Sequence, residues 1–324
     1  MSDPVILMPP NRNLEPDVVA IARQMLPSGF ELRLVPADRL ADALRGADYL
    51  MGFIGPLDDA TLLGARRLRL IQLLSVGYDQ FNLTGARAAR VPVAVNGGAN
   101  AIAVAEHAIL LMMATLRHLT ELDAGVRAGR WGSGAKRLYE LWSSTIGIVG
   151  MGRIGQEVAQ RLRGWGSTVI YFDPIRLAPE RERELEAAFV PLDELLARAD
   201  VVTVHVPLSD ATRRLIDARV LARMKPTAVL VNTSRGELVD EAALADALRS
   251  GRLGGAGLDV LSAEPPLTDH PLLSTPDTVL TPHVAGPTWQ SWPRRFGNAY
   301  ANITRVQRGE RPQWVVPELA DLIR

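Results

Sequence analysis

The sequence predicts an α/β protein of two domains, in which parallel β-sheets are covered by helices. Short apolar runs alternate with amphipathic stretches along nearly the whole chain, a pattern typical of helices packed on a parallel sheet. The chain has 324 residues, which is more than a single hydrophobic core usually organises. A glycine-rich turn follows one apolar run in the second half of the chain, as in a nucleotide-binding βαβ unit.

The composition excludes several classes of protein. The formal net charge is zero, and because Lys and Arg are scattered we expect no nucleic-acid or membrane partner. The absence of cysteine excludes disulfides, thiolate metal sites and cysteine nucleophiles. The N-terminal segment has no basic run leading into a long apolar stretch, so it does not predict a secretory signal. The longest apolar stretch, Ala101–Leu116, is too short to cross a bilayer, and a cytoplasmic protein is the default expectation.

The first third of the chain predicts a series of short βα units without a glycine fingerprint. Its expected helices include Pro16–Met25 and Leu83–Arg90. Its expected strands lie near Val5–Met8, Glu31–Val35, Tyr49–Phe53, Leu70–Leu74 and Val91–Val95.

A long, mostly apolar stretch from Asn100 to His118 predicts one buried helix that joins the two halves of the chain. Six further strands and their helices then match a full Rossmann sheet. These strands lie near Thr145–Val149, Thr168–Phe172, Val201–His205, Ala228–Asn232, Gly255–Asp259 and Thr278–Thr281.

A last helix is expected over Gln290–Arg308, and its partner is open. It either caps the Rossmann domain or crosses back to the first domain, which would create a cleft where ligands tend to bind. We expect residues 1–100 and 290–324 to form one domain and residues 101–289 to form the second domain, which contains the Rossmann sheet.

The segment Thr145–Asp173 predicts the dinucleotide site. In the GxGxxG pattern, Gly150 permits the tight turn, Gly152 lets the backbone approach the pyrophosphate, and Gly155 allows close packing of helix on strand. The phosphates would then lie at the N-terminus of the following helix, where free N–H groups and the helix dipole favour anions.

Asp173 predicts the choice of cofactor. It lies 18 residues beyond Gly155, close to the position of the acid that binds the adenine ribose hydroxyls. Its carboxylate would repel a 2′-phosphate, which favours NAD over NADP. Arg176 is the reservation, because an arginine after this strand can accommodate that phosphate.

Arg235, Glu264 and His283 follow three expected strands and would therefore gather at the carboxyl edge of one sheet. Reduction of a 2-oxo acid needs a cation for the carboxylate and an acid for the new alkoxide. Arg235 suits the first role through its planar fork, and His283 suits the second because histidine titrates near neutral pH. Glu264 would orient the imidazole and stabilise its protonated form.

Each of these residues also has a structural interpretation: a surface charge for Arg235, a loop cap for Glu264 and a core position for His283. Among the other histidines, His107 and His118 are expected to be packing residues, and His205 lies at a strand end expected to face the adenine. No pair of histidines has convincing metal spacing, so a zinc mechanism is not expected.

Together, these motifs resemble the D-isomer-specific 2-hydroxyacid dehydrogenase family over nearly the whole chain. The matching segments are LLSVGYD (Leu73–Asp79), NGGANAIAVAEH (Asn96–His107), GIVGMGRIG (Gly147–Gly155), VNTSRGELVD (Val231–Asp240), GLDVLSAEP (Gly257–Pro265) and TPHVAG (Thr281–Gly286).

The resemblance implies a flavodoxin-like, discontinuous substrate-binding domain and a homodimer built through the Rossmann domain. It implies that Arg235, Glu264 and His283 are catalytic, and that the substrate carboxylate is held near Val76, Gly77 and Asn100. The expected cofactor contacts, besides the three glycines, are Arg153, Ile154, Asp173, Val206, Pro207, Thr212, Thr233, Ser234, Asp259 and Gly286.

Within this family, Glu264 argues against formate dehydrogenases, which have Gln there, and Val76 argues against phosphite dehydrogenases, which have Lys. LLSVGYD looks like the glyoxylate and hydroxypyruvate reductases. Phosphoglycerate dehydrogenase activity stays an alternative, although many such enzymes carry a C-terminal regulatory domain for which this chain ends too early. An NAD(H)-sensing corepressor-like binding protein is another alternative.

Substrate choice is expected to depend on Phe53, Ile54 and the Trp131–Trp142 loop. Trp289 and Trp292 either close the pocket over a substrate or pack between the domains.

Overall fold

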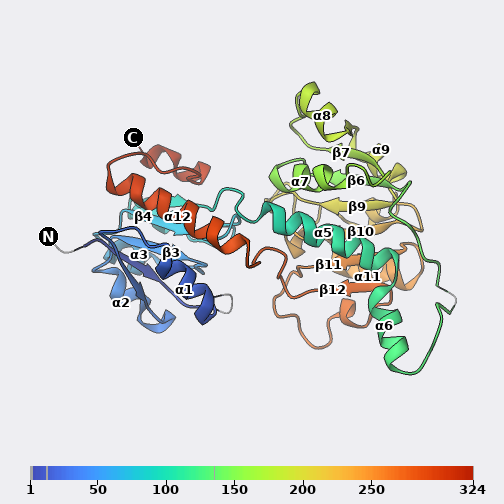
Figure 1. The fold of residues 1–324 in the computed structure, drawn as a ribbon, viewed down its shortest axis with the longest axis horizontal. Helices are drawn as coiled ribbons and strands as arrows, with labels where there is room; N and C mark the ends of the chain where they lie inside the picture. The colour runs from blue at the N-terminus through green and yellow to red at the C-terminus, as the bar shows by residue number, and fades with distance from the viewer. Residues whose placement is uncertain (1–2, 12–13, 135, 324) are drawn as a thin grey trace. The chain divides into compact units, whose positions relative to one another are not determined.

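The computed structural model describes residues 3–11, 14–134 and 136–323, and its contacts divide the chain into two compact units (Figure 1). Unit 1 contains Met1–Asn100 and Pro287–Arg324, and unit 2 contains Ala101–Gly286. The C-terminal helix α12 (Ser291–Gln307) returns to the first sheet, where it packs against β4 and α1. The division falls at Pro287, slightly before the expected residue 290.

Unit 1 is built on five parallel strands in the order β2-β1-β3-β4-β5, which is the flavodoxin-like order. The strands are β1 (Val5–Met8), β2 (Glu31–Leu34), β3 (Tyr49–Gly52), β4 (Leu70–Leu73) and β5 (Val93–Ala94). Besides α12, the helices are α1 (Pro16–Gln24), α2 (Leu40–Leu44), α3 (Asp59–Gly64), α4 (Leu83–Ala88) and the 3₁₀ turns η1 (Ala37–Arg39) and η4 (Pro317–Leu322).

The three central strands of unit 1 are buried on both faces because helices cover both sides of the sheet. All residues of β1, β3 and β4 are buried, which explains why these strands are apolar apart from Gln72 in β4. On α12, the rings of Trp292 and Phe296 stack at 5.9 Å, and those of Phe296 and Tyr300 at 6.2 Å. Trp292 is 4% exposed and packs within the core of unit 1, whereas Trp289 is exposed; the expected roles of the two tryptophans at the pocket or between the domains stay predictions.

Unit 2 is built on seven parallel strands in the order β12-β11-β10-β9-β6-β7-β8. The strands are β6 (Thr145–Val149), β7 (Thr168–Phe172), β8 (Ala187–Phe189), β9 (Val201–Val204), β10 (Val229–Asn232), β11 (Gly255–Leu258) and β12 (Thr278–Leu280). The helices are α5 (Ala101–Leu116), α6 (Leu119–Arg127), α7 (Arg153–Leu162), α8 (Pro179–Leu185), α9 (Leu192–Arg198), α10 (Ala218–Leu221), α11 (Glu241–Arg249) and the 3₁₀ turns η2 (Gly236–Leu238) and η3 (Pro271–Ser274).

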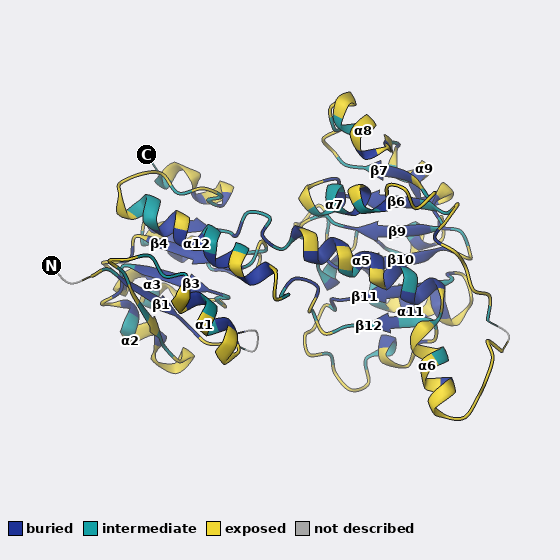
Figure 2. Cartoon of the chain, viewed as in Figure 1, coloured by how far each residue is buried: buried dark blue, intermediate teal, exposed yellow. Residues whose placement is uncertain are grey.

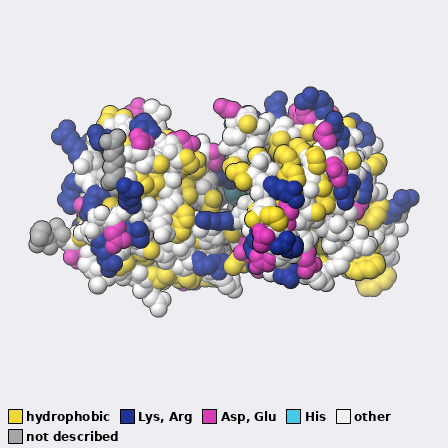
Figure 3. Space-filling model, turned by 90° about the horizontal axis from the view of Figure 1, so that it is seen from above, with side chains coloured by type: hydrophobic (Ala, Val, Ile, Leu, Met, Phe, Trp, Pro, Cys, Tyr) yellow, Lys and Arg dark blue, Asp and Glu magenta, His cyan; other side chains and the backbone are white. Residues whose placement is uncertain are grey.

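Helix α5 is the main support of this sheet. It packs against β10, β11, β12 and α7, and its residues are mostly buried, whereas α6 and α8 are largely exposed (Figure 2). Among the described residues no single helix is long and apolar enough to span a membrane; α5 and α6 would reach that length only as a pair bent by 60°. On the face drawn in Figure 3, acidic and basic side chains are interspersed, in keeping with the zero net charge.

The sequence missed the edge strand β8. It has three residues, of which only Ala187 is buried, so it lacks the buried apolar run that marks the other strands of this sheet. The six expected strands are therefore joined by a seventh, which pairs with β7.

Candidate active site

The glycines after β6 have the geometry that their proposed roles require. Gly150 has a φ of +97°, and a Cβ there would lie 2.8 Å from the carbonyl of His205. A Cβ on Gly155 would lie 2.2 Å from the carbonyl oxygen of Gly150, so α7 approaches β6 more closely than any side chain permits. Gly152 caps α7, and nothing lies within 4 Å of its Cβ position. The N-terminus of α7 is thus open to an approaching group.

Asp173 follows β7 and joins it to this glycine turn. Its Oδ2 accepts a hydrogen bond from the Met151 N–H at 2.8 Å, and its Oδ1 accepts one from the Ile175 N–H at 2.9 Å. The next predicted contacts lie in the first turn of α7, where Arg153 is exposed and Ile154 is half-buried. The structure therefore brings the predicted acid to the glycine turn.

Arg176 is directed toward Glu182. Its Nε and Nη2 each lie 2.9 Å from a Glu182 carboxylate oxygen, and its guanidinium lies 5.4 Å from the centre of the Phe189 ring. Hydrogen bonds from Arg176 and from the Tyr171 hydroxyl lower the pKa of Glu182 to about 2. Arg176, the residue that could have accommodated the 2′-phosphate of NADP, is thus already paired with a carboxylate.

The end of β9 carries His205, Val206 and Pro207. The His205 Nε2 lies 2.9 Å from the Thr203 hydroxyl, and burial lowers the pKa of His205 to about 3, because a charged imidazole would be held away from water. Val206 is half-buried against the core, and the carbonyl of Pro207 accepts a hydrogen bond from the Thr212 hydroxyl at 2.7 Å. Thr212 therefore closes the turn after this strand.

The end of β10 carries Thr233 and Ser234, whose hydroxyls differ. The Ser234 hydroxyl donates to the Val204 carbonyl at 2.9 Å and ties β10 to β9. The Thr233 side chain is buried, and its Oγ1 has no hydrogen-bond partner in the part of the chain that the structure describes. A buried hydroxyl without a partner costs free energy unless a ligand or a water supplies one, so Thr233 is placed to receive a ligand.

Glu264 and His283 form a hydrogen-bonded pair. The His283 Nδ1 lies 2.7 Å from Glu264 Oε2, and the two side chains are 40% and 28% exposed. The other Glu264 oxygen accepts a hydrogen bond from the Leu261 N–H at 3.2 Å. His283 itself has a φ of +54°, a left-handed conformation that non-glycine residues seldom adopt. Because Nδ1 faces Glu264, Nε2 is the ring nitrogen that can meet a substrate.

Arg235 lies on the segment that supports the Glu264 loop. Its Nη1 donates to the Ser234 carbonyl at 2.7 Å. The next residue, Gly236, packs so closely on the loop that a Cβ there would lie 2.0 Å from the Leu261 carbonyl carbon and 2.1 Å from the Ser262 nitrogen. The segments bearing Arg235 and Glu264 are therefore in direct backbone contact.

Asp259 supports the segment that carries His283. Its carboxylate is 1% exposed and accepts hydrogen bonds from the Thr281 hydroxyl at 2.6 Å and from the Val284 and Ala285 N–H groups, both at 2.9 Å. Burial acts to raise its pKa, but these donors and His107 outweigh burial and lower it. The predicted cofactor contact of Asp259 stays a prediction; the sequence did not suggest this supporting role. Gly286, the last residue of unit 2, is buried directly after the segment.

His107 is more than the packing residue expected from the sequence. Its Nε2 lies 2.9 Å from the Thr281 hydroxyl and 3.4 Å from Asp259 Oδ1. The only signal in the sequence was a polar residue, next to Glu106, inside the mostly apolar α5. Because Thr281 is 174 residues away, no local pattern could connect the two.

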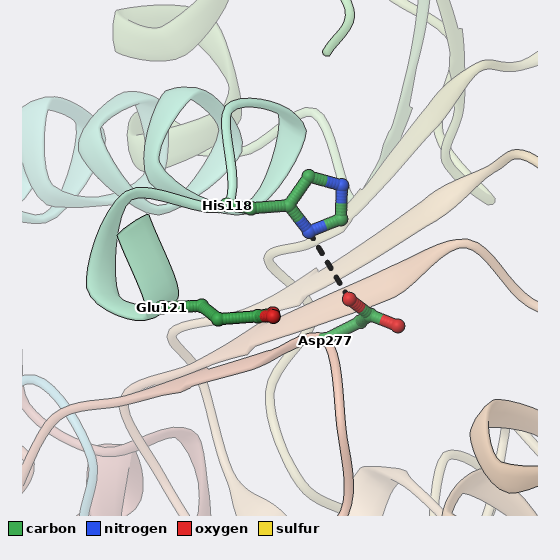
Figure 4. Close-up of side chains that lie close together, drawn as sticks. All are labelled: His118, Glu121 and Asp277. Atoms are coloured by element: carbon green, nitrogen blue, oxygen red, sulfur yellow. Dashed lines mark ion pairs between the residues drawn. The ribbon is translucent and has the colours of Figure 1, made fainter. Parts of the chain in front are cut away.

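His118 also has polar partners rather than a packing role. Its Nδ1 lies 3.1 Å from Asp277, and with Glu121 these side chains place three ligand-type atoms within 4.8 Å of one another (Figure 4). Lys136 Nζ lies 2.6 Å from Asp277 and 2.9 Å from Glu121. An ammonium group thus already pairs with both carboxylates of this cluster, which the spacing of histidines in the sequence did not suggest.

The residues predicted to hold the substrate carboxylate belong to unit 1. Val76 is exposed and follows β4, and the Gly77 carbonyl accepts a hydrogen bond from the Ser75 hydroxyl at 2.8 Å. Asn100 Oδ1 is buried, with no partner among residues 3–11, 14–134 and 136–323. The predicted catalytic and cofactor-binding residues lie in unit 2, and Phe53 and Ile54 lie in unit 1.

The residues of unit 2 fit a dinucleotide. The tight turn at Gly150, the open helix N-terminus at Gly152 and the unpartnered hydroxyl of Thr233 offer room, N–H donors and a polar contact at one edge of the sheet. These are the features that nucleotide recognition at the carboxyl edge of a doubly wound sheet requires.

Residues 109–285 match the family model described as D-isomer specific 2-hydroxyacid dehydrogenase, NAD binding domain. The chain is 38% identical over 278 residues to a glyoxylate reductase of Korarchaeum cryptofilum, an alignment that covers 84% of this chain and 83% of the relative. The chain is also 37% identical over 314 residues to a D-3-phosphoglycerate dehydrogenase of Mycobacterium bovis. This alignment covers 96% of the chain but only 58% of that relative.

Solved structures give the same result for the fold. A glyoxylate reductase from Paecilomyes thermophila superposes with a TM-score of 0.84 and is 30% identical in sequence. The superposition covers 98% of this chain and 99% of that structure, so it includes both sheets.

Proposed function

The chain belongs to the D-isomer specific 2-hydroxyacid dehydrogenases, and we propose that it transfers a hydride between NAD(H) and a small 2-oxo acid of the glyoxylate or hydroxypyruvate type. The contact of 2.7 Å between His283 Nδ1 and Glu264 carries this proposal. An imidazole held by a carboxylate at the carboxyl edge of a nucleotide-binding sheet suits proton exchange with an alcohol or a ketone.

Three side chains of this protein have separate roles in the proposed reduction. Arg235 binds the carboxylate and the carbonyl of the substrate through its planar guanidinium. His283 Nε2 gives its proton to the carbonyl oxygen, and Glu264 stabilises the imidazolium before that transfer and orients the ring. The nicotinamide cofactor, when bound, supplies the hydride that adds to the carbonyl carbon. In the reverse direction, His283 takes the hydroxyl proton.

The test of this proposal is a panel of 2-oxo acids assayed by the absorbance of NADH. We expect glyoxylate or hydroxypyruvate to be reduced, and we expect His283→Ala to lower kcat by about two to four orders of magnitude, the usual contribution of a general acid. Glu264→Gln should lower kcat with little effect on NADH binding. No NADH oxidation with any acid of the panel, or full activity of His283→Ala, would refute the proposal.

The phosphoglycerate dehydrogenase relative gives a second candidate substrate. Nearly the whole of this chain aligns with that relative, although the alignment spans just over half of the relative's length. We therefore include 3-phosphohydroxypyruvate in the panel. A kcat/KM for this phosphorylated acid at least tenfold above that for glyoxylate and hydroxypyruvate would favour the second candidate.

We propose NAD rather than NADP as the cofactor. The Asp173 carboxylate would repel a 2′-phosphate, and Arg176 is already held by Glu182. We expect kcat/KM to be at least tenfold higher with NADH than with NADPH, and Arg176→Ala to leave that ratio unchanged. A preference for NADPH that disappears in Arg176→Ala would assign the phosphate to this arginine.

We also propose a homodimer built through unit 2. Its described surface exposes large apolar side chains, among them Trp131 at 91%, Trp142 at 65%, Leu119 at 53% and Val126 at 52%. An interface between two copies of the chain would remove such apolar side chains from water. Light scattering after gel filtration should give twice the mass of the chain, and Trp131→Glu should lower it. A monomer at micromolar concentration would refute this assembly.

A further inference from the structure

The loop that carries Glu264 is held by a residue outside the proposed catalytic set. Residues 260–270 form neither helix nor strand, and most of them are exposed. A loop of this kind has no ladder hydrogen bonds to fix its conformation. The position of Glu264 opposite His283 must therefore come from other contacts.

Glu241, the first residue of α11, supplies these contacts. Its Oε1 accepts a hydrogen bond from the Ser262 N–H at 2.7 Å, and its Oε2 accepts one from the Ser262 hydroxyl. Oε2 also lies 3.0 Å from His270 Nε2. Ser262 lies near the start of the loop and His270 at its end, so one carboxylate joins both ends of the loop to α11.

In the contact between His270 and Glu241, the imidazole is the donor and the carboxylate is the acceptor. Its Nδ1 accepts from the Leu272 N–H at 3.4 Å, which places the ring proton of the neutral form on Nε2. Nε2 can therefore donate to Glu241 without a change of protonation. The Glu241 and His270 side chains are only 12% and 14% exposed, and hydrogen bonds to a carboxylate shielded from water are among the strong ones.

Gly236 contacts the same stretch of the loop as Glu241. Its backbone leaves no room for a Cβ against Leu261 and Ser262, so the loop rests on the segment that follows Arg235. That contact limits how far the loop can approach but does not stop it from lifting away. The hydrogen bonds from Ser262 to Glu241 oppose this second movement.

We propose that Glu241 is a positioning residue, which holds residues 260–265 on Gly236 so that Glu264 faces His283. The inference rests on the proposed function of the Glu264–His283 pair. When the Glu241 carboxylate is removed, the loop can lift by more than the few tenths of an ångström that a hydrogen bond tolerates. Displacements near 1 Å in a catalytic arrangement can cost two orders of magnitude in rate.

The experiment compares Glu241→Ala, Glu241→Gln and Ser262→Ala with Asp246→Asn as a matched control. Asp246 lies on the same helix in an exposed ion pair with Arg249 and contacts no part of the loop that the structure describes. We expect Glu241→Ala to lower kcat by roughly 10- to 100-fold while the Kd of NADH changes less than twofold. Glu241→Gln keeps one oxygen for the Ser262 N–H and should restore part of the loss. Ser262→Ala removes only the hydroxyl contact and should lower kcat less than Glu241→Ala does.

Hydrogen–deuterium exchange provides a readout that does not depend on activity. Amides of residues 260–264 should exchange at least tenfold faster in Glu241→Ala than in the unmodified protein, whereas those of β11 should not change. Faster exchange in a protein without dehydrogenase activity would support the positioning role and refute the proposed function. Unchanged exchange, or unchanged kcat in an active enzyme, would refute the positioning role. Equal losses in Glu241→Ala and Asp246→Asn would also refute it, because they would indicate a general effect on α11.

Discussion

Replacing Asp259 by asparagine tests how the segment bearing His283 is held. The substitution keeps the size of the side chain and exchanges one carboxylate oxygen for an NH₂ group. In the structure Oδ1 accepts from the Thr281 hydroxyl and the Val284 N–H, and Oδ2 accepts from the Ala285 N–H. An asparagine oxygen can replace only one of these acceptors. With that oxygen at the Oδ1 position, its NH₂ group faces the Ala285 N–H, and two donors oppose each other.

The expected cost follows from the bonds that are lost. A hydrogen bond to a charged group contributes about 1.5–3 kcal/mol, and a buried donor left without an acceptor costs a further 1–3 kcal/mol. Allowing for local relaxation, we expect Asp259→Asn to lower the free energy of unfolding of unit 2 by about 3 kcal/mol. This is a little over two orders of magnitude in the unfolding equilibrium. Because the displaced segment carries His283, kcat should fall as well.

The dependence on pH gives a second signature. The pKa of Asp259 is lowered in the folded protein, so its stabilisation is present above the unfolded value of about 3.9. That stabilisation is lost as the pH falls through the lower folded value. Urea titrations should therefore show a large difference between the variant and the unmodified protein at pH 7, which narrows from pH 5 toward pH 3.

The control for this experiment is Asp246→Asn, in which an exposed pair is broken; its free energy of unfolding should change by less than about 0.5 kcal/mol. An Asp259→Asn protein with an unchanged urea midpoint at pH 7 would contradict the reasoning. So would a difference that grows as the pH falls.

Three further substitutions test other parts of the site. Gly155→Ala places a Cβ 2.2 Å from the Gly150 carbonyl oxygen; it should destabilise unit 2 by about 1–3 kcal/mol and weaken NADH binding, as urea titration and fluorescence can measure. Thr233→Val removes a hydroxyl that has no described partner; the urea midpoint should stay the same or rise, while the Kd of NADH increases, and an unchanged Kd would exclude a cofactor contact. In the folded protein the pKa of His205 is about 3, below the unfolded value of about 6.5. The free energy of unfolding should therefore fall by up to about 1.4 kcal/mol per pH unit as the pH drops from the higher value to the lower one. His205→Asn should make this dependence on pH weaker in urea titrations.

Strands with buried residues on both faces could be predicted from the sequence, and the short edge strand β8 could not. In β6 the run Thr145–Val149 is apolar because helices cover both sides of the sheet, and such runs need no information from elsewhere in the chain. β8 owes its conformation to pairing with β7, which is a property of the folded sheet. The return of α12 to the first sheet was equally open, because its apolar stripe would fit either domain.

The same distinction applies to the candidate site. Arg235, Glu264 and His283 could be placed near one another because parallel strands present their carboxyl ends at one edge. The partners of these residues could not be predicted. Glu241 and His107 contact the site through hydrogen bonds that span 21 and 174 residues of the chain, and a polar residue in a helix gives no sign of its distant partner.

Carboxylates at this edge of unit 2 share a function that residue type alone does not reveal. Asp173, Glu241, Asp259 and Glu264 each accept a hydrogen bond from a backbone N–H of a loop that follows a strand. Loops at the carboxyl edge are outside the hydrogen-bond ladder of the sheet. Their N–H groups therefore need other acceptors, and a carboxylate is a strong acceptor. An acid in such a position therefore predicts a loop anchor as well as a ligand contact. Asp259 and Glu264 differ in their burial and in the partners of their two oxygens: both oxygens of the buried Asp259 accept backbone N–H groups, whereas Glu264 gives one oxygen to its own loop and directs the other at His283. On this reasoning Asp259 acts on the reaction through the position of His283, and Glu264 acts on the imidazole itself.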